Sequence, residues 1–219
     1  YTKDKEELEK EVKDYLEKGK ETSYSGKLKA LIVPHAGYVY SGIVAGAGFK
    51  LLRGRKFKKI ILLGPTHRFY FRGAAIAEKD FETPLGRVKV GEIKEWLEEE
   101  QIGELSEAHL EEHCLEVELP FLQQVLGDFK IVPILLSQTN NGFLANISRL
   151  ISNNFDNQTL LVISSDLSHY PAYDVAQKVD KETIKAILSG KPAVFDQKIS
   201  FNLNQPGVET CACGAQAIK

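Results

Sequence analysis

The chain has 219 residues, of which 43% are hydrophobic and 26% charged, and its formal net charge is -2. This size and composition are typical of one globular domain that buries roughly 70% of its unfolded surface. A charge near zero, without a long basic run, gives no electrostatic reason to expect nucleic acid or a membrane surface as a partner.

The chain also shows no sign of export or of membrane insertion. No apolar run approaches the ~20 residues that span a bilayer, and the N-terminal YTKDKEELEKEV is too charged for a signal peptide. The three cysteines, Cys114, Cys211 and Cys213, do not suggest a disulfide framework, because their number is odd and no export signal accompanies them. We therefore expect a cytoplasmic protein whose thiols are free or bind a metal.

Hydrophobic periodicity predicts strands that alternate with helices along the chain. The predicted strands are the first half of Leu28–Gly42, then Ile60–Leu63, Ala74–Ala77, Arg87–Val90, Lys130–Leu136 and Leu160–Ser164. The predicted helices are Lys5–Lys18 ended by Gly19, Ser41–Leu52, Glu92–Gln101, a helical segment kinked or divided at Pro120, Gly142–Asn153, Val175–Leu188, Ala193–Lys198 and the start of CACGAQAIK. This alternation predicts an α/β fold, a three-layer sandwich with a central, largely parallel or mixed sheet.

Several residues have an expected role in packing or at the surface. Trp96, Tyr38 and Tyr40 are assigned to packing, with pocket lining as the alternative for the two tyrosines, and His109 is assigned to the surface. The segment Asp80–Gly86 contains a proline and a glycine in ETPLG, which predicts a turn-rich loop.

Chemistry-bearing side chains follow three of the predicted strands. His35 follows the first strand, His67 the second, and Asp166 with His169 the last. Ligands bind in open α/β sheets at the carboxyl ends of the strands, so we expect these side chains to meet at one edge. A hydrogen-bonded structural role for each histidine is the alternative.

Imidazole nitrogens and a thiolate are good ligands for zinc, copper and iron. His35, His67 and Cys213 are the candidate metal ligands, although the sequence does not separate Cys213 from Cys211. His169 is the candidate general base, because its unperturbed pKa of about 6.5 suits proton transfer near neutrality. Asp166 is a candidate to orient it, with a helix-capping role as the alternative.

Two other kinds of site lack their sequence motifs. Serines lie near His169, but no GxSxG elbow exposes a nucleophile. The glycines after His35 match neither GxGxxG nor a Walker loop, so a phosphate-binding glycine motif is not indicated.

Seven ordered motifs resemble those of the Memo family, also known as AmmeMemoRadiSam system protein B. They are PHAGYVYSG, LLGPTH, ETPLG, EHCLEVELPFLQ, IVPILL, SSDLSHY and TCACGAQAI, and the resemblance runs from about Tyr1 to the last residue. It implies a fold similar to the LigB-type class III extradiol dioxygenases, in which two histidines and a carboxylate hold iron(II). In the Memo family a cysteine replaces the carboxylate.

The resemblance also implies site residues. His35, His67 and Cys213 match the ligand positions, Asp166 and His169 line the same pocket, and His169 matches the dioxygenase base. A thiolate shifts the metal preference from iron(II) toward copper(I) or zinc, so dioxygenase activity does not transfer with the fold.

His113, in EHCLE, is expected to line the pocket too. Two departures from the family pattern stand out. The family usually has serine where Cys114 stands, and its members continue past the CG helix with further strands, so we expect the single domain 1–219 to lack its C-terminal end.

Two functional hypotheses follow. The first is a metal-dependent redox protein with copper or iron as cofactor, zinc being a further candidate, and with an unidentified substrate. The second is a non-catalytic module that binds a peptide or partner protein in the same pocket. The resemblance implies partners of the radical SAM and AMMECR types, and the sequence leaves turnover, substrate and oligomeric state open.

Overall fold

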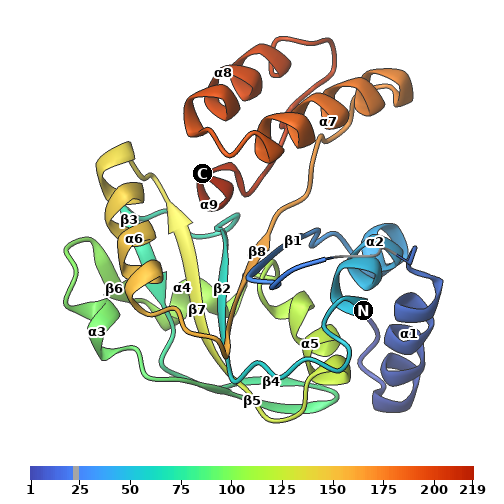
Figure 1. The fold of residues 1–219 in the computed structure, drawn as a ribbon, viewed down its shortest axis with the longest axis vertical. Coiled ribbons are helices and arrows are strands. Elements are labelled where there is room, and N and C mark those ends of the chain that lie inside the picture. The colour runs from blue at the N-terminus through green and yellow to red at the C-terminus, as the bar shows by residue number, and fades with distance from the viewer. Residues whose placement is uncertain (22–24) are drawn as a thin grey trace.

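An eight-stranded, mostly parallel sheet forms the centre of the fold in the computed structural model, which describes residues 1–21 and 25–219 (Figure 1). The strands are β1 (Ala30–Val33), β2 (Lys59–Pro65), β3 (Gly73–Ile76), β4 (Phe81–Thr83), β5 (Gly86–Val90), β6 (Ile102–Glu104), β7 (Lys130–Ser137) and β8 (Thr159–Ser164). The main path runs β1-β8-β2-β7-β3-β6. The predicted strands are therefore all present, in an α/β fold.

Strands β1, β8, β2 and β7 are mutually parallel neighbours, and β3 lies antiparallel to β7. Strand β6 is parallel to β3. Strand β5 runs parallel to the first residues of β7 and forms a hairpin with β4. The sheet is therefore mixed, with the parallel strands β1, β8, β2 and β7 at one end of the strand path, and this confirms the prediction of a largely parallel or mixed sheet.

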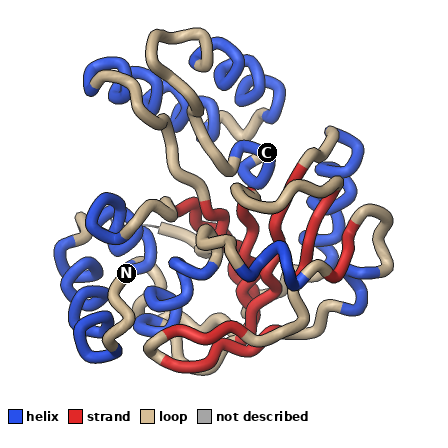
Figure 2. Tube along the Cα trace, turned by 180° about the vertical axis from the view of Figure 1, so that it is seen from behind, coloured by secondary structure: helices blue, strands red, loops and turns tan. Residues whose placement is uncertain are grey.

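Helices cover both faces of this sheet (Figures 1 and 2). They are α1 (Lys5–Lys18), α2 (Tyr38–Lys50), α3 (Lys94–Leu97), α4 (Ser106–Leu110), α5 (Leu119–Val125), α6 (Asn141–Asn153), α7 (Tyr173–Leu188), α8 (Pro192–Asn202) and α9 (Ala215–Ile218), with a 3-10 turn η1 (Glu116–Glu118) before α5. Side chains of β2 alternate between two cores: Ile60 and Leu62 pack with α1, α2 and α5, whereas Ile61 and Leu63 pack with α3, α6 and α9. This alternation confirms the three-layer sandwich.

Helix α1 shows how local sequence sets an element. The Asp4 side chain caps it by accepting the Glu7 amide N–H at 2.8 Å, and Gly19 ends it. The buried side chains Leu8, Val12 and Leu16 follow helical spacing and face α2 and α5. The prediction for this helix is confirmed.

Helices α7 and α8 pack on each other beyond the carboxyl ends of β7 and β8 (Figure 1). A connection from β8 leads up to α7, and the chain returns from α8 to α9, which contacts β2 and β8. This return brings the segment before α9 back to the edge of the sheet. Across residues 1–21 and 25–219, no helix combines the length and apolar character needed to cross a membrane.

The predicted helix over Glu92–Gln101 is wrong in extent. Only Lys94–Leu97 is helical, and β6 follows because Ile102 pairs with Ala74 of β3. A tertiary pairing with a distant strand therefore overrides the local helical pattern. The prediction that Trp96 packs inside is confirmed, since its side chain is buried.

Further local predictions are corrected. Helix α2 begins at Tyr38, three residues earlier than predicted; Tyr38 is buried and its hydroxyl donates to the Val117 carbonyl at 2.7 Å. Tyr40 is 85% exposed because it lies on the outer face of α2. The prediction that Tyr40 packs in the core is therefore wrong. His109 is buried, not at the surface, because its Nε2 donates to the Ala75 carbonyl at 3.1 Å.

Two more segments refine the predictions for loops and helix boundaries. The turn-rich loop Asp80–Gly86 includes β4, which pairs with β5. Pro120 lies in the first turn of α5, where a missing amide hydrogen costs nothing, so it marks a helix boundary and not a kink.

Candidate metal centre

Three neighbouring parallel strands deliver side chains to the same edge of the sheet. Residue pairing aligns Val33 at the end of β1 with Ser164 at the end of β8, and β2 lies on the other side of β8. His35, His67 and Asp166 each stand two residues beyond these strand ends. The register therefore brings together residues that are far apart in sequence.

Cys213 reaches this edge from the segment before α9. Its Sγ lies 3.2 Å from His35 Nε2, and its amide N–H donates to the Asp166 carbonyl at 3.2 Å. Ligand atoms of His35, His67 and Cys213 all lie within 4.8 Å of one another. The structure thus places the three predicted ligands in one cluster.

Gly214 permits this approach. A Cβ at this position would lie 2.6 Å from the Ser164 carbonyl oxygen and 2.7 Å from Ser165 Cβ. The Gly214 amide instead donates to Ser165 Oγ at 3.0 Å. A side chain here would push Cys213 away from the histidines.

His35 is held from behind by a buried polar chain. Its Nδ1 lies 2.7 Å from Ser164 Oγ, which in turn lies 2.7 Å from the Cys114 carbonyl and 2.9 Å from Glu118 Oε1. If Nδ1 donates to Ser164, Nε2 presents its lone pair to Cys213. Glu118 is fully buried, and burial raises the pKa of its carboxyl, which favours the neutral form.

Glu112 holds His67 through Nδ1, as Ser164 holds His35. Its Oε1 lies 2.9 Å from His67 Nδ1 and its Oε2 accepts the His67 amide N–H at 2.5 Å. The amides of His113 and Cys114 also donate to Oε1, at 3.0 and 3.2 Å. A carboxylate bonded to Nδ1 leaves Nε2 of His67 for the cluster.

The electrostatics of the cluster favour a thiolate. Burial raises the pKa of Cys213, but hydrogen bonds with His35 and His67 outweigh it and lower that pKa to about 6. Hydrogen bonding to Cys213, followed by that to Glu112, raises the pKa of His67 to about 10. Burial opposes ionisation of Glu112, yet bonds from His67 and the Cys114 amide lower its pKa to about 2.

Asp166 and His169 lie beside the cluster. Asp166 Oδ1 accepts the amides of His35 and Ala36 at 2.9 and 3.1 Å, and its own amide N–H donates to Cys213 Sγ at 3.2 Å. His169 Nε2 lies 3.8 Å from Asp166 Oδ2, and the His169 backbone pairs with Thr210. Asp166, His169 and Cys213 form a second group of ligand atoms within 4.8 Å.

A family model described as "Memo-like protein" matches residues 1–219. The chain belongs to the Memo family. A MEMO1 family protein of Aquifex aeolicus is 36% identical over 226 residues, which cover 100% of this chain and 83% of that relative.

Two other MEMO1 family proteins, from Saccharolobus solfataricus and Thermotoga neapolitana, are each 41% identical, over 166 and 165 residues. These matches cover 71% and 72% of this chain, but 58% and 59% of the relatives' own lengths.

Two further candidate residues of this Memo family chain, His113 and Cys211, differ in position: His113 lies at the cluster and Cys211 lies away from it. The His113 ring stacks on His67 with ring centroids 5.3 Å apart and is half exposed, so it lines the site. Burial lowers the pKa of His113. Cys211 is buried with Val179 and Val208, away from the cluster.

Cys114, at the position where the family usually has serine, is buried. Its Sγ lies 3.1 Å from the Pro65 carbonyl, and burial raises its pKa. Together with His67 and Glu112 it forms a further group of ligand atoms within 4.8 Å. The neutral thiol is a poor ligand, so this group is weaker than that of His35, His67 and Cys213.

The donor set fits a metal ion. Around a tetrahedral ion with bond lengths of about 2.0 Å to nitrogen and 2.3 Å to sulfur, the two nitrogens lie about 3.3 Å apart and each nitrogen lies about 3.5 Å from the sulfur. The 3.2 Å separation of His35 Nε2 and Cys213 Sγ is close to that value. Both imidazoles are anchored through Nδ1 and aim Nε2 inward, as is usual for metal ligands.

Sequence reasoning missed Glu112, Glu118 and the positioning role of Ser164. Glu112 lies beside His113 in the EHCLE segment, and its position next to a candidate pocket histidine was the available signal. Glu118 carries no such signal, because an acidic residue on an apolar segment is ordinarily exposed.

Proposed function

We propose that this Memo family protein is a metal-binding redox protein that holds copper or iron through His35, His67 and Cys213. The observation that carries the proposal is the convergence of their three ligand atoms within 4.8 Å. The anchoring of both histidines through Nδ1 adds support, because it fixes the donor nitrogens before any ion arrives.

The donor types narrow the choice of metal. A thiolate with two imidazoles suits copper(I), zinc and iron, whereas magnesium and calcium prefer oxygen ligands. A bound copper or iron ion would supply one-electron redox chemistry, which zinc does not provide. Copper and iron are therefore the proposed cofactors, and zinc is a non-redox alternative.

The protein's own residues have separate proposed roles. His169, which is about one third exposed, would accept or release a proton at Nε2 for a ligand in the pocket. Asp166 Oδ2 faces that nitrogen, while Oδ1 fixes the backbone around His35. Glu112 and Ser164 would position the metal ligands.

We also propose a cytoplasmic location. Cys114, Cys211 and Cys213 are all free thiols, which suits a reducing compartment.

A second candidate function, a non-catalytic binding module, rests on exposed aromatic side chains near two site histidines. Tyr70 follows His67 closely and is 75% exposed, and Tyr170 follows His169 and is 82% exposed. Exposed tyrosines are common in recognition surfaces. Proteins of the radical SAM and AMMECR types are the proposed partners in that case.

Elemental analysis of untagged protein tests the first function, with anaerobic reconstitution by copper(I), iron(II) or zinc(II) as a second arm. We expect near-stoichiometric copper or iron in the wild type and at least tenfold less in Cys213→Ser. The matched control is Cys211→Ser, which removes a buried thiol outside the cluster and should retain the metal.

Two results would overturn the proposal: no copper or iron bound after reconstitution, or equal loss of metal in both serine variants. Consumption of oxygen by the metal-loaded wild type, absent in Cys213→Ser, would favour redox chemistry. Partner binding that survives both His35→Ala and Cys213→Ser would favour the binding module.

A further inference from the structure

A basic pocket lies at the opposite edge of the sheet from the metal centre. It has a volume of about 340 Å³ and is lined by residues of three segments, which precede β1, precede β2 and lead into β8. Because β1, β8 and β2 are parallel neighbours, their amino ends meet here just as their carboxyl ends meet at the cluster. The register of the sheet therefore builds two separate sites.

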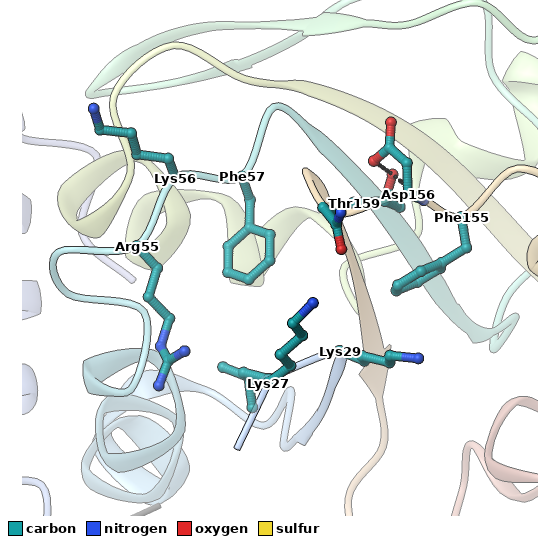
Figure 3. Close-up of a pocket in the computed structure, with 10 residues that line it drawn as sticks. Lys27, Lys29, Arg55, Lys56, Phe57, Phe155, Asp156 and Thr159 are labelled. Atoms are coloured by element: carbon teal, nitrogen blue, oxygen red, sulfur yellow. Dashed lines mark hydrogen bonds between the residues drawn. The ribbon is translucent and has the colours of Figure 1, made fainter. Parts of the chain in front are cut away.

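Four cationic residues line this pocket, Lys27, Lys29, Arg55 and Lys56, and the ammonium group of Lys56 points away from the others in Figure 3. Figure 3 shows Lys27 reaching between the rings of Phe57 and Phe155, with Arg55 and Lys29 on either side. Lys29 and Arg55 place positive charge on two sides of the pocket, so an anion bound between them would be stabilised.

Among the described residues that line the pocket, Asp156 is the carboxylate, and it forms no ion pair with Lys29, Arg55 or Lys56. Asp156 Oδ1 accepts the Thr159 hydroxyl at 2.7 Å and the Gln158 amide at 2.8 Å, which holds it within its own turn. Within residues 1–21 and 25–219, Lys29, Arg55 and Lys56 form no ion pair.

A hydrogen bond to the backbone holds the Arg55 side chain in a position where it can bind an anion. Its Nε donates to the Leu51 carbonyl at 2.9 Å, which fixes the side chain while leaving the terminal guanidinium nitrogens as donors. A guanidinium held in this way loses little conformational freedom when it binds a phosphate with its planar donors. The lysines add charge on flexible stems.

The interior of the pocket is apolar. Phe57 and Leu28 are buried and Phe155 is partly buried, and all three line the pocket beneath the cations. An inorganic ion alone would leave this apolar surface unused, whereas a planar ring would stack against it. The volume is at the lower end of the range for small-molecule sites.

We propose that this pocket binds a small phosphorylated molecule that carries an aromatic ring, of the size of a nucleoside diphosphate. The cations hold the phosphates, and the phenylalanines contact the ring. The site is independent of the metal centre, because none of its lining residues contributes to the cluster.

Calorimetric titration with ADP, inorganic pyrophosphate and adenosine tests the proposal on the wild-type protein. We expect saturable binding of ADP that weakens as salt rises, and at least tenfold weaker binding of the other two probes. The double variant Lys29→Gln/Arg55→Gln should bind ADP at least tenfold more weakly. Its metal content should remain that of the wild type.

The matched control is Lys181→Gln/Arg149→Gln, which removes the same charge from exposed sites on α7 and α6 and should leave ADP binding within twofold of wild type. Thermal unfolding of both double variants checks that they fold. Absence of saturable ADP binding at millimolar concentration, or equal weakening in the two double variants, would overturn the proposal. Pyrophosphate binding as tight as that of ADP would overturn the role of the apolar interior.

Discussion

Replacing Glu112 with glutamine should weaken metal binding and lower stability. One carboxylate oxygen accepts the amides of His113 and Cys114 and faces His67 Nδ1, while the other accepts only the His67 amide. A glutamine has one carbonyl oxygen and one NH2 group. Whichever way it turns, its NH2 group faces a backbone N–H that then lacks an acceptor.

The magnitude follows from these contacts. An unsatisfied buried N–H costs about 1 to 3 kcal/mol, and the remaining bonds lose their charge assistance. We expect Glu112→Gln to lower the free energy of unfolding of the metal-free protein by about 2 to 4 kcal/mol. Loss of a partner that orients a ligand histidine lowers metal affinity about 10- to 100-fold, and the same range is expected here.

Urea unfolding of the metal-free protein and metal competition against a chromophoric chelator measure the two effects. The matched control is Glu111→Gln, since Glu111 is exposed and neighbours Glu112 in sequence. Unchanged metal affinity in Glu112→Gln, or an equal loss in Glu111→Gln, would refute the reasoning that Glu112 positions His67.

Two further predictions concern packing and pH. Gly46→Ala should lower stability by about 1 to 3 kcal/mol in urea unfolding, because its Cβ would lie 2.4 Å from the Tyr15 carbonyl oxygen. Gly127→Ala has open space and should change stability little; an equal effect would contradict the packing argument. Burial raises the pKa of Glu116 to about 7, so the folded state binds its proton more tightly than the unfolded state and stability falls as pH rises from about 4.5 to above 7. Glu116→Gln should therefore be more stable than wild type at pH 8, by at most about 3 kcal/mol, with a smaller difference at pH 5; a difference that does not vary with pH would show that Glu116 is not responsible.

Much of the fold could be predicted because its strands are continuous apolar runs. Buried parallel strands such as β2 and β7 have no polar face, so their sequence marks them directly. The positions of His35 and His67 followed from the strands, since a residue just past a parallel strand end must lie at the carboxyl edge.

Other features depend on contacts that no local pattern records. Strand β6 has three residues and exists because Ile102 pairs with Ala74. His109 is buried because a carbonyl 34 residues away accepts its ring N–H. Glu112 faces a histidine 45 residues away, and its adjacent residues Glu111 and His113 are both exposed.

No local sequence pattern shows which of Cys211 and Cys213 lies beside the histidines. The two residues are separated by a single alanine, so sequence spacing cannot distinguish them. The return of the chain from α8 directs Cys213 toward His35 and leaves Cys211 among the apolar residues near α7. Only the tertiary path of the chain decides which sulfur lies beside His35 and His67.

That path has a consequence for synthesis of the protein. Cys213 lies 178 residues after His35, so the two histidines leave the ribosome long before the thiol that completes the donor set. A nascent chain offers only two imidazole nitrogens at this edge until Cys213 emerges, and two donors hold an ion less tightly than three. Under the proposed function, metal binding by all three ligands would therefore follow synthesis of the sheet, and a chain interrupted before Cys213 would offer the metal only the two histidines.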